Sequence, residues 1–338
     1  MQGGRFGAVG PADGAGTGDL AGGGVVAVAG EVIMDMVPAG APDLFRAAPG
    51  GSPANVAVGL ARLDIPVRLL ARLSGDVLGR RLRAHLAANG VDLSHAIPAA
   101  EPSSLAIVVL ADDGSADYDF RVDGTSDWQW TDTEVADAVD GVAALHVGSL
   151  GLTTPPGGEV LRRLAARARE TATVTFDPNV RHLLMGSAEA TMRIVDEMLP
   201  VADVVKASDE DVAWLAPGRS LTDVAGEWAA RGPAVVVVTR GGDGAVAVGT
   251  AAGAVERPGL PVDVVDTVGA GDSFMGAVLA GLHRRGLLGA EHRERMRAMD
   301  EATVTALVDE AVEVSAITCS RRGADPPTAQ DLRERHGG

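Results

Sequence analysis

Residues 266–274 read Asp-Thr-Val-Gly-Ala-Gly-Asp-Ser-Phe and combine small residues with a carboxylate. Gly269, Ala270 and Gly271 allow consecutive backbone N–H groups to surround an anion, because small residues let a ligand approach closely. The apolar run that follows predicts a helix, whose N-terminus also favours negative charge. A carboxylate at Asp272 weakens a simple anion site, but it suits a base that deprotonates a hydroxyl attacking a phosphate. The segment therefore predicts phosphoryl transfer to a small molecule.

A second glycine-rich segment, residues 49–55, reads Pro-Gly-Gly-Ser-Pro-Ala-Asn and precedes a predicted helix. Its glycines, Gly51 among them, let a ligand approach the backbone, and Asn55 on the first turn offers a donor and an acceptor. Taken alone, the segment is also explained by a turn with a helix cap. Asp35, just after the first predicted strand, can accept hydrogen bonds from sugar hydroxyls, although a solvated loop acid is the plainer interpretation of that residue by itself.

Polar residues follow three further predicted strands. Residues 177–181 read Asp-Pro-Asn-Val-Arg and residues 206–211 read Lys-Ala-Ser-Asp-Glu-Asp. Both lie at the carboxyl ends of strands, where open α/β sheets bind ligands. Lys206 can neutralise phosphate charge and Asp211 can hold Mg²⁺ through water, although a surface acid cluster is an alternative explanation of the acids. Residues 239–244, Thr-Arg-Gly-Gly-Asp-Gly, form a turn able to lie beside a nucleotide.

The composition excludes several classes of protein. The 338 residues carry a net charge of −17, which argues against nucleic acid or an anionic membrane as a partner. The one cysteine, Cys319, cannot form an intrachain disulfide or a Cys-based zinc site. Lys206 is the only lysine, and no Gly-Lys-Ser/Thr tripeptide occurs, so a Walker A loop is excluded.

The N-terminal segment and the hydropathy indicate where the protein works. No apolar run approaches the roughly 18 residues of a membrane span. Residues 1–24 are rich in Gly and Ala and lack the apolar core of a signal peptide. We therefore expect these residues to form a disordered leader, and the protein to be cytoplasmic.

The remaining elements alternate between strands and helices, which indicates a mostly parallel sheet covered by helices on both faces. Residues 33–47 and 100–125 do not follow the alternation, and we expect them to form a small separate sheet over the site. Residues 329–338 are expected to form a loose tail. Strands are predicted over 25–29, 64–71, 105–110, 117–122, 143–147, 173–176, 204–206, 234–239 and 244–248, and helices over 52–63, 76–90, 160–171, 190–199, 221–230 and 274–282.

The order of these motifs resembles the ribokinase-like (PfkB) carbohydrate kinases over residues 25–328, as one kinase domain. The Gly-Gly-Ser-Pro-Ala-Asn segment resembles the family's N-terminal signature, and residues 266–274 its C-terminal one. Residues 120–128, Phe-Arg-Val-Asp-Gly-Thr-Ser-Asp-Trp, and residues 318–327 look most like bacterial fructokinases. The resemblance implies a three-layer α/β/α fold with a small β lid.

The resemblance also implies roles for single residues. Asp272 would be the base, and Gly269, Ala270 and Gly271 the anion hole for the transferred group. The sugar would be held by Asp35, Gly51, Asn55 and Arg121, and ATP by Asn179, Lys206, Thr239, Gly241 and Gly244. Asp266 would help to coordinate a monovalent cation, usually K⁺. Asp211 would serve Mg²⁺, although Ser208 and Asp211 replace the family's usual Asn-x-x-Glu.

These implications lead to an ATP-dependent sugar kinase with fructose as the first candidate acceptor. A 2-keto-3-deoxygluconate kinase is the alternative; its carboxylate needs a cation such as Arg121, and the residues do not decide between the two. A sugar- or nucleotide-binding protein without catalysis is the third interpretation, and the intact Gly-Ala-Gly-Asp counts against it. Relatives commonly pair through the lid, so a homodimer is also expected.

Overall fold

The computed structural model describes residues 24–40, 44–110 and 116–337, so that nearly all of the expected leader lies outside the described residues. The elements predicted above are all found, with ends that differ by a few residues. The strands are β1 Val25–Ala29, β2 Ile33–Pro38, β3 Phe45–Gly50, β4 Val67–Leu70, β5 Arg72–Ser74, β6 Ile97–Ala99, β7 Leu105–Leu110, β8 Ala116–Arg121, β9 Val142–Gly148, β10 Thr173–Asp177, β11 Val204–Ser208, β12 Val235–Thr239, β13 Ala245–Gly249 and β14 Gly253–Arg257. The helices are α1 Ser52–Arg62, α2 Val77–Ala88, α3 Ser149–Thr153, α4 Gly157–Ala168, α5 Ala188–Met198, α6 Asp209–Leu215, α7 Leu221–Ala229, α8 Ala270–Arg284, α9 Arg293–Arg297, α10 Glu301–Cys319 and α11 Ala329–Gly337, with 3-10 turns η1 Ser126–Trp128, η2 Gly241–Asp243 and η3 Ala290–His292.

The centre of the molecule is an eight-stranded sheet in the order β14-β13-β12-β11-β10-β9-β1-β4. The six strands from β12 to β4 pair in parallel, and β13 and β14 add an antiparallel edge. The inner strands are continuous apolar runs such as Val235-Val-Val-Val238, because both of their faces are buried. This sheet confirms the predicted mostly parallel α/β architecture.

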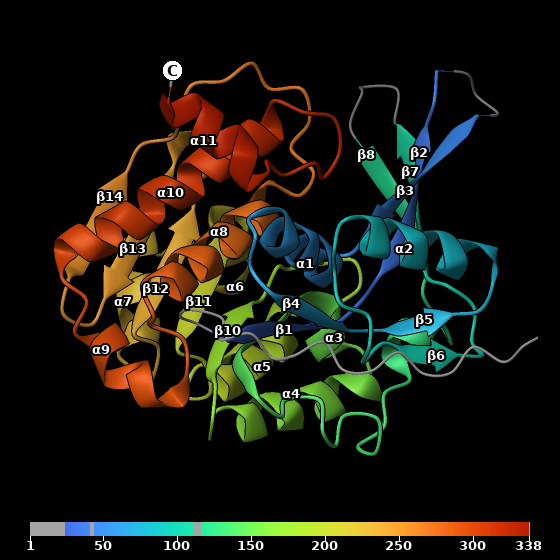
Figure 1. Cartoon of the computed structure of the whole chain (residues 1–338), viewed down its shortest axis with the longest axis horizontal. Coiled ribbons are helices and arrows are strands. Elements are labelled where there is room, and N and C mark those ends of the chain that lie inside the picture. Colours follow the sequence, from blue (N-terminus) through green and yellow to red (C-terminus); the bar gives the residue numbers. More distant parts are fainter. Residues whose placement is uncertain (1–23, 41–43, 111–115, 338) are drawn as a thin grey trace, which may run out of the picture.

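Helices cover both faces of the sheet, and each face has its own apolar core (Figure 1). One core joins the sheet to α1, α2, α8 and α10, and the other joins it to α4, α5, α6 and α7. Helix α8 packs between α1 and α10, so its N-terminus is fixed against two neighbours. The resulting three layers are those implied by the resemblance.

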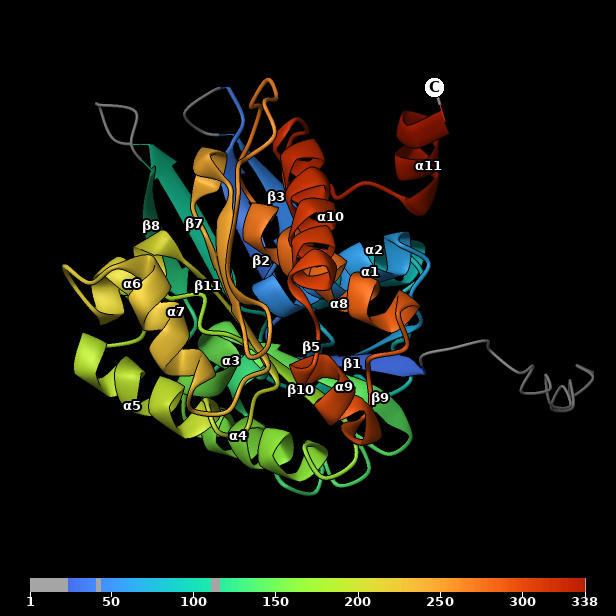
Figure 2. The same ribbon diagram turned by 90° about the vertical axis from the view of Figure 1, so that its left-hand side faces the viewer.

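A second sheet stands apart from the central one. Its four strands run in the order β3-β2-β7-β8, and in Figures 1 and 2 they project beyond one end of the layered body. These strands come from the two segments that broke the strand–helix alternation, and we call them the lid. The turn between β7 and β8 lies outside the described residues.

The C-terminal part differs most from expectation. Helix α10 lies outside the predicted elements, because its many β-branched residues are poor helix formers and only burial of its apolar face stabilises it. The expected loose tail is helix α11, which has no buried residue and contacts the body through ion pairs such as Arg321–Asp331 and His336–Glu313. No helix in the described ranges is long and apolar enough to cross a membrane.

Candidate active site

Helices α1 and α8 bring the two glycine-rich segments together, although 220 residues separate Ser52 from Asp272. Ser52 Oγ donates a hydrogen bond to Asp272 Oδ1 at 2.6 Å, and Asn55 Nδ2 donates to Asp272 Oδ2 at 2.8 Å. Asp272 is 8% exposed, and both carboxylate oxygens are therefore oriented by α1. Asn55, which was expected to hold the sugar, thus donates a side-chain N–H to the expected base.

The start of α8 has the shape of an anion site. Gly269 caps the helix with φ of 78°, a left-handed conformation that L side chains rarely adopt. A Cβ on Gly269 would lie 2.6 Å from Ala324 Cβ, and one on Gly271 would lie 2.8 Å from Lys206 Nζ. The left-handed conformation and the close backbone require glycine at position 269, whereas a side chain at position 271 would have to displace the Lys206 ammonium group, which lies close to the N-terminus of α8.

Lys206 is buried and forms an ion pair with Asp177, with Nζ 2.9 Å from Oδ2. Lys206 lies in the middle of β11, and Asp177 is the last residue of the adjacent strand β10. Burial alone would lower the pKa of Lys206, but the carboxylates of Asp177, Asp211 and Asp272 outweigh it and raise that pKa. A permanent positive charge among three acids follows. Asp177 belongs to the segment 177–181 that the sequence analysis placed at a strand end, but no role was expected for it.

The segment after β10 carries a strained residue. Asn179 has φ of 37°, its backbone N–H donates to Asp177 Oδ1 at 3.0 Å, and its buried Nδ2 has no hydrogen-bond partner among the described residues. A buried donor without a partner is costly unless a ligand accepts from it. Arg181, which lies in the singled-out segment 177–181 but was given no role, donates to Asn179 Oδ1 at 2.8 Å and is exposed.

The lid contributes Asp35, the third residue of β2. Burial, with the nearby charge of Asp272, raises the pKa of Asp35 to about 6, while the charge of Arg181 opposes the shift. Asp35 therefore lies close enough to Asp272 and Arg181 for both charges to act on it. Arg121, the other expected sugar ligand of the lid, instead pairs with Asp119 on its own strand and its side chain is 62% exposed. The remaining sugar candidate, Gly51, has φ of 101° and lies against the backbone of Glu31.

The expected nucleotide residues after β12 lie beside the loop that leads to α8. A Cβ on Gly244 would lie 2.1 Å from Arg257 O, so only glycine lets this turn pack closely against the start of the loop. Gly241 has φ of 52° and open space around it, and Thr239 Oγ1 donates to Ala207 O at 3.3 Å. The loop itself exposes apolar side chains that could cover a planar base, namely Leu260, Val264, Val265 and Val268.

The two carboxylates expected to serve cations, Asp211 and Asp266, accept hydrogen bonds from backbone N–H groups. Asp211 Oδ1 accepts from Val180 N–H and Oδ2 from Ser208 N–H, each at 2.7 Å, as part of the capping box that starts α6. Asp266 Oδ2 accepts from Gly323 N–H at 2.8 Å and so joins the loop before α8 to the one after α10. Within the ranges that the structure describes, no group of three His, Cys, Asp or Glu side chains is arranged to hold a metal ion.

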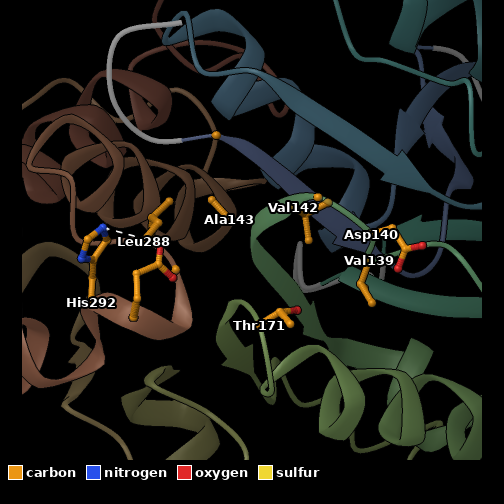
Figure 3. A pocket seen from close by; sticks show the side chains of 11 residues that line it. Val139, Asp140, Val142, Ala143, Thr171, Leu288 and His292 are labelled. Carbon is orange, nitrogen blue, oxygen red and sulfur yellow. Dashed lines mark ion pairs between the residues drawn. The ribbon is translucent and has the colours of Figure 1, made fainter. Parts of the chain in front are cut away.

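A hollow of about 500 Å³ lies elsewhere, at the opposite edge of the sheet (Figure 3). It is lined by the chain just before β9 and β10, with Val142 and Thr171, and by residues near Leu288 and His292. Because parallel strands begin at this edge and end at the other, the hollow is separate from the groups around Asp272.

Comparison with known proteins accounts for this arrangement. Residues 25–331 match the model of the pfkB family carbohydrate kinases. The chain is 33% identical to a fructokinase of Rhizobium leguminosarum bv. trifolii over 275 residues, which cover 80% of this chain and 83% of that protein.

Solved structures agree. The structure of the Xylella fastidiosa fructokinase with bound ATP matches with a TM-score of 0.83 and 26% identity, over 93% of this chain and 99% of that one. A fructokinase double mutant of Vibrio cholerae O395, solved with fructose, ADP and a potassium ion, matches with a TM-score of 0.74 and 27% identity, over 90% of this chain and 94% of that one. The ribokinase-like resemblance and fold are thereby confirmed, and the chain belongs to the pfkB family of carbohydrate kinases.

Proposed function

We propose that this ATP-dependent sugar kinase phosphorylates fructose, with Asp272 as the base. The observation that carries the proposal is the carboxylate of Asp272, which Ser52 and Asn55 orient at a helix N-terminus backed by Lys206. The relatives named fructokinase support the choice of sugar.

The chain's own residues suit each part of the transfer. Asp272 takes the proton of the sugar hydroxyl while the hydroxyl oxygen bonds to the γ-phosphorus of ATP. The bond from that phosphorus to the leaving ADP oxygen breaks. We assign the backbone N–H groups of Gly269, Ala270 and Gly271 to the charge that grows on the transferred group, and the Ala270 N–H, which donates to Thr267 O at 3.2 Å, must leave that carbonyl to take part. Lys206, held by Asp177, supplies positive charge without changing its position, so little reorganisation accompanies the step.

The proposal places ATP and the cations at the residues that the family resemblance implies. Asn179 offers its unpartnered Nδ2 to a phosphate oxygen, and Thr239, Gly241 and Gly244 shape the wall for the rest of ATP. Mg²⁺ supplies charge neutralisation when it arrives with ATP. Because both oxygens of Asp211 accept backbone N–H groups, that residue reaches the ion through water only. Asp266 belongs to a K⁺ site; the potassium ion of the Vibrio cholerae structure supports this.

A 2-keto-3-deoxygluconate kinase is the second candidate. The charge of Arg181 acts on Asp35 within the site, and a cation there suits a sugar acid better than a neutral sugar. Arg121 is the weaker cation for this purpose, since it is already paired with Asp119.

Two further assignments are part of the proposal. Leu44, just before β3, and Phe45, the first residue of β3, are exposed on the lid, which supports pairing of two copies through the lid as a homodimer. The net charge of −17 supports an enzyme of small metabolites without a nucleic acid partner, which we assign to the cytoplasm.

The test is an ADP-release assay with ATP and Mg²⁺, with and without K⁺, across fructose, 2-keto-3-deoxygluconate, ribose, glucose and a nucleoside. Turnover with fructose far above the others is the expected result. A preference for the keto acid would replace fructose and direct attention to Arg181. Equal rates with and without K⁺ would contradict the assignment of Asp266.

A further inference from the structure

The lid joins the body of the molecule at a few chain crossings, and one buried acid lies among them. β2 begins after Val32, β7 begins after Ser104, and the chain leaves β8 through Thr125. Asp127, in the 3-10 turn η1, is 0% exposed. Val32 N–H donates to Asp127 Oδ1 at 2.7 Å, and Ser104 Oγ lies 2.5 Å from Asp127 Oδ2. Ser104 Oγ lies in turn 2.5 Å from Thr125 Oγ1.

The contacts around Asp127 form a chain of hydrogen bonds. Ser104 Oγ donates to Asp127 Oδ2, and Thr125 Oγ1 donates to Val122 O at 2.7 Å. Burial raises the pKa of Asp127 to about 6, and the bond from Ser104 opposes that shift. An asparagine keeps the bond from Val32 N–H through its side-chain oxygen, and its amide N–H can donate to Ser104 Oγ when that hydroxyl turns toward Thr125.

The position of β2 depends on these contacts. Val32 precedes Asp35 by three residues. Met34 N–H donates to Ser104 O at 3.0 Å, so β2 and β7 are bonded to each other at their first residues, next to Asp127. On the other side, the backbone of Glu31 lies against Gly51 at the start of α1, the helix that orients Asp272. A shift of Val32 therefore moves Asp35 relative to Asp272.

We propose that Asp127 is a positioning residue for the sugar. It fixes the first residues of β2 and β7 at the base of the lid, and thereby sets the place of Asp35 opposite Asp272. The proposal rests on the proposed function, in which Asp35 holds the sugar. Misplacement of a substrate group by about 1 Å can cost as much as 10²-fold, so the effect is measurable.

The experiment compares Asp127→Ala, Asp127→Asn and Ser104→Ala in the full chain with wild type. Steady-state kinetics use whichever sugar the wild type phosphorylates, and hydrogen exchange of the β2 and β7 amides needs no sugar. The control is Asp203→Asn, because Asp203 is also buried and holds Arg169 and Arg293, but at the opposite edge of the sheet. Ser104→Ala tests the same contact if Asp127→Ala does not fold.

For Asp127→Ala we expect a sugar KM raised about 10- to 100-fold, with the KM for ATP little changed. Exchange of the β2 and β7 amides should accelerate. Asp127→Asn should keep both properties near wild type, and Asp203→Asn should leave the sugar KM unchanged. Wild-type sugar KM and lid exchange in Asp127→Ala and Ser104→Ala would overturn the proposal. Inactivity of the wild type on all sugars would refute the proposed function alone, because the exchange data still test the contact.

Discussion

A single methyl group at Gly271 tests how closely Lys206 backs the anion hole. A Cβ there would lie 2.8 Å from Lys206 Nζ, whereas non-bonded heavy atoms are comfortable at about 3.5–4.0 Å. The ammonium group must therefore move by several tenths of an ångström or more, away from Asp177 Oδ2 at 2.9 Å. Breaking a buried ion pair costs about 3–5 kcal/mol, while Gly→Ala in a helix recovers about 1 kcal/mol. We expect Gly271→Ala to lower the free energy of unfolding by about 2–4 kcal/mol.

The same helix supplies the matched control. A Cβ on Gly276 would lie 3.6 Å from Val56 O, an ordinary contact, so Gly276→Ala should be neutral or stabilise the protein by up to about 1 kcal/mol. Urea unfolding gives both free energies. In the ADP-release assay, kcat of Gly271→Ala should fall on the order of 10²-fold, because a displaced charge no longer supports the transferred group. If Gly271→Ala matches Gly276→Ala in stability and kcat, Lys206 is not pressed against the anion hole.

Three other changes have defined outcomes. Asp272→Ala should reduce turnover by about 10²–10⁴-fold if Asp272 is the base, and near-normal kcat would remove that assignment. Burial raises the pKa of Glu31 to about 7 from its ordinary value of 4.5, so the folded protein loses stability as the pH rises from about 4.5 to 7, by about 3 kcal/mol. Glu31→Gln should remove this loss and unfold at higher urea than wild type at pH 8 but not at pH 4; equal midpoints at pH 8 would show that the group ionises freely. Lys206 is 3% exposed, so an amine-reactive reagent should modify an ε-amino group only after unfolding, and mass spectrometry of labelled native protein checks this.

Much of the fold follows from local signals. Apolar runs such as Val235–Val238 predict strands, and glycines that follow helices predict turns, whatever the tertiary contacts of those segments are. The alternation of strands and helices then predicts a parallel sheet. Helix α10 could not be predicted this way, because its β-branched residues acquire helical structure only by packing on α8.

The sequence by itself determined the chemistry at the start of α8. The Gly-Ala-Gly-Asp order fixes small residues and one carboxylate within a single helical turn, and no tertiary contact is needed to predict an anion site with a base in it. The place of Asp177 at the end of β10 likewise follows from where parallel strands end, whereas Lys206 lies within β11 and Asp35 within β2 of the lid.

Only the tertiary structure decided what those groups contact. Ser52 and Asn55 reach Asp272 because α1 packs against α8, and Asp177 pairs with Lys206 because β10 lies beside β11. Asp211 shows the limit most clearly: its spacing from Ser208 fits a metal residue and a capping box equally well, and the structure uses both of its oxygens for backbone N–H groups. A side chain's partner depends on distances between segments far apart in the chain, and those distances exist only once the layers have packed.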